Sequence, residues 1–269
     1  MFQKSQVTLF QQKSTAMSKP LVFTSIAEFR KFRKNITGSV GFVPTMGALH
    51  QGHASLMQQA ANENSFSVLS IYVNPTQFNN PTDLEKYPVT FDADLKLAES
   101  CGIKAVLAPN YSDIYPDQYR YKLSENDYSK LLCGAHRPGH FDGVLTVVMK
   151  LLNIVQPSKA YFGEKDFQQL KLIEDMVTSF FMNIEIVHGK TIREDSGLAM
   201  SSRNRRLSPA GFEKAALIYM LLKSENSVES IKKQFIENGF EIDYVEEHFN
   251  RRFAAVTLEG VRLIDNVEI

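Results

Sequence analysis

The sequence predicts an α/β fold in which a parallel sheet carries helices on both faces, with a smaller α+β domain towards the C-terminus. Three observations predict it. Short apolar runs alternate with helical patterns about five times between residues 40 and 187, as strand–helix–strand units do. After His188 the sequence becomes rich in Gly, Ser, Asp and Arg. Two late apolar runs around Glu259-Gly260 then have the pattern of a β-hairpin.

The first elements follow from capping signals, apolar runs and prolines. Ser25 and Glu28 form a capping-box pattern, and an apolar run that stops at Pro44 indicates a buried strand. The expected elements are a helix from Ser25 towards Asn35, a strand at 40–43, a helix at 53–64, a strand at 68–73, a loop at 74–90, a helix at 92–100 with Gly102 as its C-cap, and a strand at 105–108 closed by Pro109.

The later elements include one long irregular stretch, residues 110–142, in which a single short helix is expected near 124–132. Such stretches inside enzymes are often functional loops. The elements expected after it are a helix at 144–155, a strand at 160–162, a helix at 166–181, a strand at 184–187, a polar loop at 189–209, helices at 210–223 and 227–237, and a hairpin of 253–257 with 261–264. A second, smaller domain is expected from about residue 190.

Composition argues against nucleic-acid-binding and membrane proteins. Lys+Arg and Asp+Glu are 30 each among 269 residues, so the formal net charge is zero, whereas nucleic-acid binders usually have a basic excess. No apolar run approaches the ~20 residues that span a bilayer.

Residues 1–19 are polar and lack the apolar region of a signal peptide, so they are expected to be a flexible extension, or an overcalled start with Met17 as the real beginning. The cytoplasm is the expected location. Cys101 and Cys133 form no CxxC motif.

The strongest chemical signal is the segment Pro-Thr-Met-Gly-Ala-Leu-His-Gln-Gly-His at 44–53, between a predicted strand and a predicted helix. Gly52 lets the backbone approach a ligand, and a helix start suits a phosphate. His50 and His53 can donate hydrogen bonds to the charge that develops when a phosphoryl bond breaks. A lone histidine usually has no such role, but two that flank a glycine here favour function. A metal site is less favoured, because no third ligand stands at a familiar spacing.

A second segment, Tyr72–Phe78, follows the next predicted strand. In open α/β sheets ligands bind beyond the carboxyl ends of the strands. Asn74 and Gln77 can orient hydroxyl groups and a carboxylate without adding charge. An Asn-Pro turn would by itself also explain this segment, so it gains weight only beside the others.

A third segment, Phe162–Leu170, again joins a strand to a helix. Gly163 permits close approach, Lys165 supplies a point charge for phosphate, and Gln169 lies one turn along the helix. Asp166 is expected to cap that helix, which is compatible with a binding role for its neighbours.

A fourth segment, Met200-Ser201-Ser202-Arg203-Asn204-Arg205, combines hydroxyl groups, backbone N–H groups and arginines that suit a triphosphate. The alternative is a solvated basic loop that touches RNA. Beside the other three segments, ATP is the better interpretation.

The His50-x-Gly52-His53 spacing resembles the signature of the nucleotidyltransferase superfamily, and 200–205 resembles the mobile Lys-Met-Ser-Lys-Ser-type loop of related adenylate-forming enzymes. From about Phe23 to Asn266 the sequence resembles the pantothenate synthetase (pantoate–β-alanine ligase) family. Six ordered blocks carry this resemblance: Pro-Thr-Met-Gly-Ala-Leu-His at 44–50, Val-Asn-Pro-Thr-Gln-Phe at 73–78, Arg-Pro-Gly-His-Phe at 137–141, Phe-Gly-Glu-Lys-Asp at 162–166, Arg-Glu-Asp-Ser-Gly-Leu-Ala-Met-Ser-Ser-Arg-Asn at 193–204 and Arg-Leu-Ile-Asp-Asn at 262–266.

The resemblance implies a Rossmann-like nucleotide- and pantoate-binding domain at 20–189 and a C-terminal lid domain at 190–269. It implies that ATP, with Mg²⁺, activates pantoate as pantoyl-adenylate, and that β-alanine then gives pantothenate. AMP and pyrophosphate are the implied by-products, and a homodimer is the implied assembly. No nucleic-acid or membrane partner is expected.

The resemblance also assigns site residues. His53, in the position of a proton donor, is implied to be catalytic together with His50, Lys165 and Arg203. Gln77 and Gln169 are implied to hold pantoate with support from Asn74, Gln77 also β-alanine, and Asp94 magnesium. The implied ATP site comprises Met46, Gly47, Ala48, Leu49, His50, Gln51, Gly52, His53, Gly163, Glu164, Lys165, Asp166, Ile192, Met200, Ser201, Ser202 and Arg203.

The sequence departs from the family pattern in three places. Ala93 interrupts a run where related sequences often have consecutive acidic residues, Asp142 stands where a basic residue is common, and the C-terminal domain is somewhat short. Two other functions are less favoured. A true nucleotidyltransferase, such as a pantetheine-phosphate adenylyltransferase, is disfavoured by Gln77, Gln169 and the second domain. An RNA-binding module built on residues 203–206 is disfavoured by the zero net charge.

Overall fold

Six parallel strands form the central sheet of the computed structural model, which describes residues 19–269. Their order is β1-β4-β3-β2-β5-β6. The chain begins at one edge with β1, crosses to the middle at β2, and moves outward through β3 to β4, which pairs with β1. It then returns to β2 and adds β5 and β6 on the other side. The strands are β1 (Leu21–Phe23), β2 (Val40–Thr45), β3 (Phe66–Ile71), β4 (Ala105–Leu107), β5 (Lys159–Gly163) and β6 (Glu185–Gly189). This reversal between β2 and β5 creates the crevice in which such sheets bind ligands.

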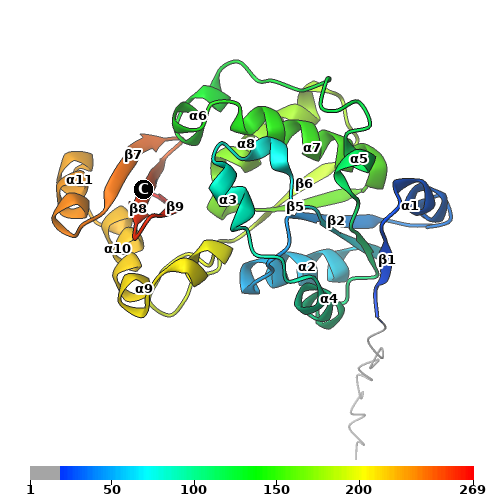
Figure 1. Cartoon of the computed structure of the whole chain (residues 1–269), viewed down its shortest axis with the longest axis horizontal. Helices are drawn as coiled ribbons and strands as arrows, with labels where there is room; N and C mark the ends of the chain where they lie inside the picture. Colours follow the sequence, from blue (N-terminus) through cyan, green and yellow to red (C-terminus); the bar gives the residue numbers. More distant parts are fainter. Residues whose placement is uncertain (1–18) are drawn as a thin grey trace, which may run out of the picture.

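Helices cover both faces of this sheet, as Figure 1 shows, with α7 and α8 on one side and α2 and α4 on the other. The strands alternate accordingly: Phe42 faces the core under α7 and α8, whereas Val43 faces the core under α2 and α4. This period of two is what a sheet buried on both faces requires. The covering helices are α1 (Ile26–Arg33), α2 (Gln51–Glu63), α4 (Phe91–Ser100), α7 (His140–Val155) and α8 (Phe167–Ser179).

Shorter helices shape the loops above the sheet. Asn80 caps α3 with its side chain, which accepts a hydrogen bond from the N–H of Thr82. These pieces are η1 (Pro75–Gln77), α3 (Pro81–Glu85), α5 (Tyr111–Ile114), η2 (Tyr128–Lys130), α6 (Cys133–His136), η3 (Glu164–Asp166) and η4 (Ser202–Arg206).

The C-terminal part is a three-stranded antiparallel sheet in the order β7-β8-β9, preceded by three helices. Its strand β8 alternates between two cores: Phe253 belongs to the core of the larger part, and Ala254 to a separate core with the preceding helices. The sheet therefore packs on both of its faces. These elements are α9 (Pro209–Ala215), α10 (Leu217–Lys223), α11 (Val228–Glu237), β7 (Glu241–His248), β8 (Arg251–Leu258) and β9 (Val261–Glu268). The predicted fold class is confirmed.

Two strand predictions are corrected. Pro44 does not end its strand, because β2 continues to Thr45 and Pro44 pairs with Ser70. The pairing of β2 with β5 covers only Gly41 and Phe42, so the missing N–H of Pro44 breaks no bond on that side. The sequence interpretation also missed β1, which is only three residues long, and β7, whose acidic residues are poor strand formers but suit an edge strand.

Helix predictions in the loops are corrected as well. The helix expected near 124–132 is only the short η2, because Glu125 accepts hydrogen bonds from the N–H groups of Asp127 and Ser129 and so offers the backbone a local alternative. The expected loop at 74–90 contains α3. The helix expected at 210–223 is interrupted at Ala216, whose N–H bonds Glu213 in the tighter three-residue pattern.

The extension expected at residues 1–19 lies, apart from Lys19, outside the described residues. Within residues 19–269, no helix has both the length and the apolar character needed to cross a membrane.

Candidate active site

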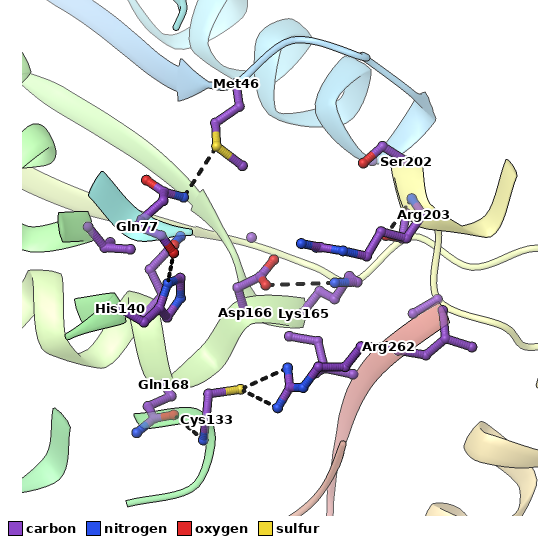
Figure 2. Close-up of a pocket in the computed structure, with 18 of the residues that line it drawn as sticks. Met46, Gln77, Cys133, His140, Lys165, Asp166, Gln168, Ser202, Arg203 and Arg262 are labelled. Carbon is purple, nitrogen blue, oxygen red and sulfur yellow. Dashed lines mark hydrogen bonds and ion pairs between the residues drawn. The ribbon is translucent and has the colours of Figure 1, made fainter. Parts of the chain in front are cut away.

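A cavity of about 730 Å³ opens beyond the carboxyl ends of β2 and β5, where the strand order reverses. Both parts of the chain line it. The first contributes Met46, His50, His53 and Lys165, and the second contributes Arg262 and Asn266. Figure 2 shows Gln77 on one side of this cavity, Arg203 on the other, and Lys165 between them.

The side chains of His50 and His53 cap the start of α2 by accepting hydrogen bonds from backbone N–H groups. The N–H of Gly52 donates to Nδ1 of His50 (3.1 Å), and the N–H of His50 donates to Nδ1 of His53 (3.3 Å). Because each Nδ1 accepts a hydrogen bond, the proton of each neutral ring is on Nε2. The helix accordingly starts at Gln51, two residues earlier than predicted.

Both imidazoles are neutral at physiological pH. Burial, with a smaller contribution from the charge of Lys165, lowers the pKa of His50 to about 4. Burial also holds the pKa of His53 well below its usual value, helped by His50 and Lys165. Each ring can therefore donate a hydrogen bond from Nε2 without carrying a charge.

The turn before these histidines is held by Asp94. Its carboxylate accepts hydrogen bonds from the N–H groups of Ala48 (3.0 Å) and Leu49 (2.8 Å) and from Oγ1 of Thr90 (3.1 Å). Gly47 and Ala48 both have positive φ, at 81° and 51°, so the turn is tight. Asp94 is 2% exposed.

The magnesium role expected for Asp94 does not fit this geometry. Both carboxylate oxygens are committed to the turn, and Asp94 does not line the cavity. Asp94 instead fixes the backbone that leads to His50.

Lys165 lies in η3, directly after β5, and its side chain is 19% exposed. Its Nζ is 3.7 Å from a carboxylate oxygen of Asp166. Asp166 stands at the N-cap position of α8, as expected, but its side chain makes no capping hydrogen bond. The ion pair with Lys165 uses the carboxylate instead.

Gln77 is held at both its side chain and its backbone. Asn74 donates from Nδ2 to Oε1 of Gln77 (3.0 Å), and Gln77 donates from Nε2 to the sulfur of Met46 (3.2 Å). The carbonyl oxygen of Gln77 accepts from Nδ1 of His140 (2.8 Å) and from Arg137 (3.2 Å). The neutral amide of Gln77, which lines the cavity, is thus held in place; Figure 2 shows its contacts with Met46 and His140.

The sequence interpretation assigned no role to His140 and Arg137, which hold the backbone of Gln77. Burial, together with the Arg137 charge, lowers the pKa of His140 to about 3. His140 is therefore neutral, and since its Nδ1 donates to Gln77, its Nε2 faces Arg137 as an acceptor (3.1 Å). Both residues belong to the sequence block at 137–141, but only the fold brings them into contact with Gln77.

Arg203 and Arg206 reach from η4 across the cavity to α3. They pair with the two carboxylate oxygens of Asp83, each at 2.8 Å. Burial by itself raises the pKa of Asp83, but the charges and hydrogen bonds of the two arginines hold it below its usual range. Ser201 accepts a hydrogen bond from the N–H of Arg203 (3.3 Å) and shapes the start of this loop.

A second contact between the two parts lies at Cys133. Its sulfur is 3.0 Å from the hydroxyl of Tyr244 and 3.6–3.7 Å from the guanidinium of Arg262, which also donates to Asp243 (2.6 Å). Figure 2 shows the contact of Arg262 with Cys133. No role for Cys133 was predicted from the sequence, because its partners lie more than a hundred residues away.

Most of the predicted site residues meet in this cavity. It is lined by Met46, His50, Gly52, His53, Asn74, Gln77, Gly163, Lys165, Asp166, Gln169, Ile192, Met200, Ser201, Ser202 and Arg203. Its lining does not include Gly47, Ala48, Leu49, Gln51, Glu164 or Asp94. Gly47, Ala48 and Leu49 form the turn before His50, and Gln51 and Glu164 begin the helical segments α2 and η3. Asp94 lies in α4 and bonds to that turn.

The comparisons with known proteins agree on one family. A family model described as pantoate-beta-alanine ligase matches residues 21–268. A pantothenate synthetase of Bdellovibrio bacteriovorus is 58% identical and the match covers 92% of this chain and 99% of that protein. One of Legionella pneumophila strain Lens is 49% identical, with 91% and 98% covered.

Solved structures agree. A crystal structure of pantoate-beta-alanine ligase from Francisella tularensis, complexed with beta-gamma ATP and beta-alanine, matches with a TM-score of 0.89 at 40% identity, over 93% of this chain and 97% of that one. Pantothenate synthetase from Thermus thermophilus matches with a TM-score of 0.84 at 36% identity, over 92% and 99%. With its fold, its cavity and these relatives, the chain belongs to the pantoate–β-alanine ligase family, the pantothenate synthetases.

Proposed function

We propose that the chain condenses pantoate with β-alanine through a pantoyl-adenylate, releasing AMP and pyrophosphate. One observation carries this proposal. The same cavity is lined by the cationic and N–H donors of His50, His53, Lys165 and Arg203 and by the neutral amides of Gln77 and Gln169. The first set suits phosphates and the second suits a hydroxy acid and an amine.

In the first step, a carboxylate oxygen of pantoate attacks the α-phosphorus of ATP, and the bond to pyrophosphate breaks. The leaving group gains negative charge, which preorganised donors stabilise. The Nε2–H groups of His50 and His53 supply neutral donors, and Lys165 and Arg203 supply positive charge. We propose that Met200, Ser201, Ser202, Ile192 and Gly163, which line the cavity, surround the nucleotide.

In the second step, the amine of β-alanine attacks the activated carbonyl. The C–N bond forms, the C–O bond to AMP breaks, and the amine loses its extra protons to solvent. The cavity supplies positioning rather than a covalent nucleophile. We propose that Gln77, fixed by Asn74, orients both pantoate and β-alanine, with Gln169 on pantoate. The Francisella tularensis relative, solved in complex with beta-gamma ATP and beta-alanine, supports binding of both kinds of ligand.

Magnesium is proposed to accompany ATP on its phosphates, since Mg²⁺ is commonly held by substrate phosphates and few carboxylates. The part of the chain at 190–269 is proposed to act as a lid over 20–189, supported by the pairing of Arg203 with Asp83 across the cavity. The homodimer and the cytoplasmic location stay predictions.

The test of the mechanism is isotopic. Pantoate labelled with ¹⁸O in its carboxylate is converted with ATP and β-alanine, and the products are analysed by mass spectrometry. One labelled oxygen is expected in AMP, because the attacking oxygen leaves with it. Label in inorganic phosphate, or ADP as the nucleotide product, would contradict the adenylate mechanism.

A further inference from the structure

Asn266, on β9 in the C-terminal sheet, bonds directly to the turn that carries Lys165. Its Nδ2 donates to the carbonyl oxygens of Glu164 (2.9 Å) and Lys165 (3.0 Å). It is 2% exposed. These carbonyls lie in the one-turn helix η3, where the short pattern leaves carbonyls in need of donors.

The other side of Asn266 is fixed as firmly. Its Oδ1 accepts from Nε of Arg251 (2.7 Å), and the guanidinium of Arg251 lies over the ring of Phe167 at 4.5 Å. The oxygen of the Asn266 amide has a donor and its nitrogen has acceptors, so the orientation of the amide is fixed. Phe167 begins α8 directly after η3, so Arg251 and Asn266 together grip this turn.

The neighbouring residue ties the same strand to the loop of the proposed lid. Asp265 accepts two hydrogen bonds from Arg193, at 2.6 and 3.0 Å. Arg193 also donates to the carbonyl of Gly197 (3.0 Å). One short piece of β9 thus contacts both the Lys165 turn and the segment that leads to Arg203.

We propose that Asn266 is a positioning residue for Lys165 in adenylate formation, acting from the C-terminal sheet across the boundary between the two parts. This rests on the proposed function of Lys165 at the ATP phosphates. The physical reason is that Asn266 on β9 fixes the backbone carbonyl of Lys165. Because the backbone is fixed, the side chain that carries the ammonium group extends from a defined position. Misplacement of a catalytic group by about 1 Å can cost about 100-fold in rate.

The first experiment uses Asn266→Asp and Asn266→Ala in single-turnover assays of each half-reaction. Asn266→Asp keeps the acceptor for Arg251 but turns a carboxylate oxygen towards two carbonyls. Both variants are expected to slow pyrophosphate release from ATP and pantoate by about 10- to 100-fold. The reaction of pre-formed pantoyl-adenylate with β-alanine should change by less than about 3-fold, since pyrophosphate has already left. Equal slowing of both half-reactions would contradict the proposal.

The second experiment is a double-mutant cycle with Lys165→Ala. If Asn266 acts through Lys165, Asn266→Ala should cost less than about 2-fold in the Lys165→Ala background. A purely structural role would give the full loss in both backgrounds, and that additivity would overturn the proposal. Melting temperatures show whether each variant is folded. If Asn266→Ala does not fold, the cycle is made with Asn266→Asp instead.

The matched control is Asn64→Ala. Asn64 also donates to two acceptors, the carbonyl of Ala60 (3.0 Å) and the hydroxyl of Tyr161 (2.7 Å), but does not line the cavity. The Asn64→Ala variant should leave the rates of both half-reactions unchanged. If the unmodified protein releases no pyrophosphate from ATP and pantoate, the proposed function fails. If it does so and the Asn266 variants match it, only the role of Asn266 fails.

Discussion

At the scale of the residue, the two histidines of the cavity have two tasks at once. Each ring lines the cavity, and the Nδ1 of each accepts a hydrogen bond from a backbone N–H at the start of α2. A substitution therefore removes a donor and part of a helix cap together, so the two effects have to be separated by the choice of variant.

His53→Ala is expected to lower kcat of adenylate formation at least about 100-fold, the effect of losing one preorganised donor. It should also lower stability by about 0.5–2 kcal/mol, because the N–H of His50 loses its acceptor. His53→Gln restores an acceptor at the capping-box position. It should recover the melting temperature without recovering kcat. Near-normal kcat in either variant would remove His53 from the mechanism.

The pH dependence follows from the lowered pKa values. The pKa of His50 is about 4, and that of His53 lies well below its usual value, because both rings are buried. A lowered pKa keeps the neutral donor form present as pH falls, until the pH approaches that pKa. The rate of adenylate formation should therefore show no histidine titration between about pH 6 and 8 and should fall as pH drops towards about 4. An inflection near 6.5 that His50→Gln abolishes would contradict neutral rings.

Asp94→Asn tests whether this residue holds the turn rather than a metal ion. The amide places an N–H against the N–H of Ala48 or Leu49, so stability should fall by about 1.5–3 kcal/mol. The magnesium concentration for half-maximal rate at saturating ATP should not change. Asp92→Asn, an exposed change on the same helix, is the control. A large shift in magnesium dependence confined to Asp94→Asn would restore the metal role.

At the scale of the element, the sequence was informative where the physical signal is local. The buried strands at 40–43 and 68–73 were recognisable because sheets covered on both faces need continuous apolar runs. The strand β7 was not, since its acidic residues are tolerated only by its edge position. The helix expected near 124–132 failed because Glu125 turns back on its own backbone.

The residues of the site also divide into those that a local sequence pattern predicts and those that only the fold brings together. His50, His53 and Lys165 could be predicted, because strand-to-helix turns mark the ligand edge of a sheet. The role of His140 could not, since His140 lies 63 positions after Gln77 in the sequence and contacts it only in the folded chain. Asp94 was identified as important, but its partners are backbone N–H groups that no sequence pattern displays.

The contact between η4 and α3 gives a prediction at this scale. Asp83 occupies Arg203 and Arg206 with its carboxylate, as a phosphate would. Asp83→Asn should therefore lower KM for ATP by about 3- to 5-fold, the equivalent of up to about 1 kcal/mol for a partly exposed pair. Glu85→Gln, exposed on the same helix, should have no effect. A raised KM would mean that Asp83 positions Arg203 for ATP instead of competing with it.

At the scale of the whole molecule, the two sheets share a core. Tyr244, Phe253 and Ala255 of the C-terminal sheet belong to the main core, while the opposite face of β8 packs under α10 and α11. The C-terminal part is therefore bound to the rest by apolar burial as well as by Asn266. The two parts should unfold together.

Phe253→Ala tests this coupling. Phe253 is 4% exposed and belongs to the main core, so its truncation should cost about 3–5 kcal/mol. Thermal unfolding followed by far-ultraviolet circular dichroism and by calorimetry should remain one coincident transition. Phe181→Ala, at a residue 95% exposed, should stay within about 0.5 kcal/mol. Two separate transitions in the unmodified protein would show that the parts are independent.

The strand order also has a consequence for synthesis on the ribosome. A nascent chain that has reached Leu107 can already pair β2, β3 and β4, but the other edge of β2 has no partner until β5 is made. At about 5 to 20 residues per second, the roughly 50 residues between Leu107 and Lys159 take several seconds to emerge. During that time β2 is an open edge, and Pro44 offers no N–H to a foreign strand. Pro44, just before the turn at Gly47 and Ala48, therefore removes one N–H through which the unfinished chain could pair with a foreign strand.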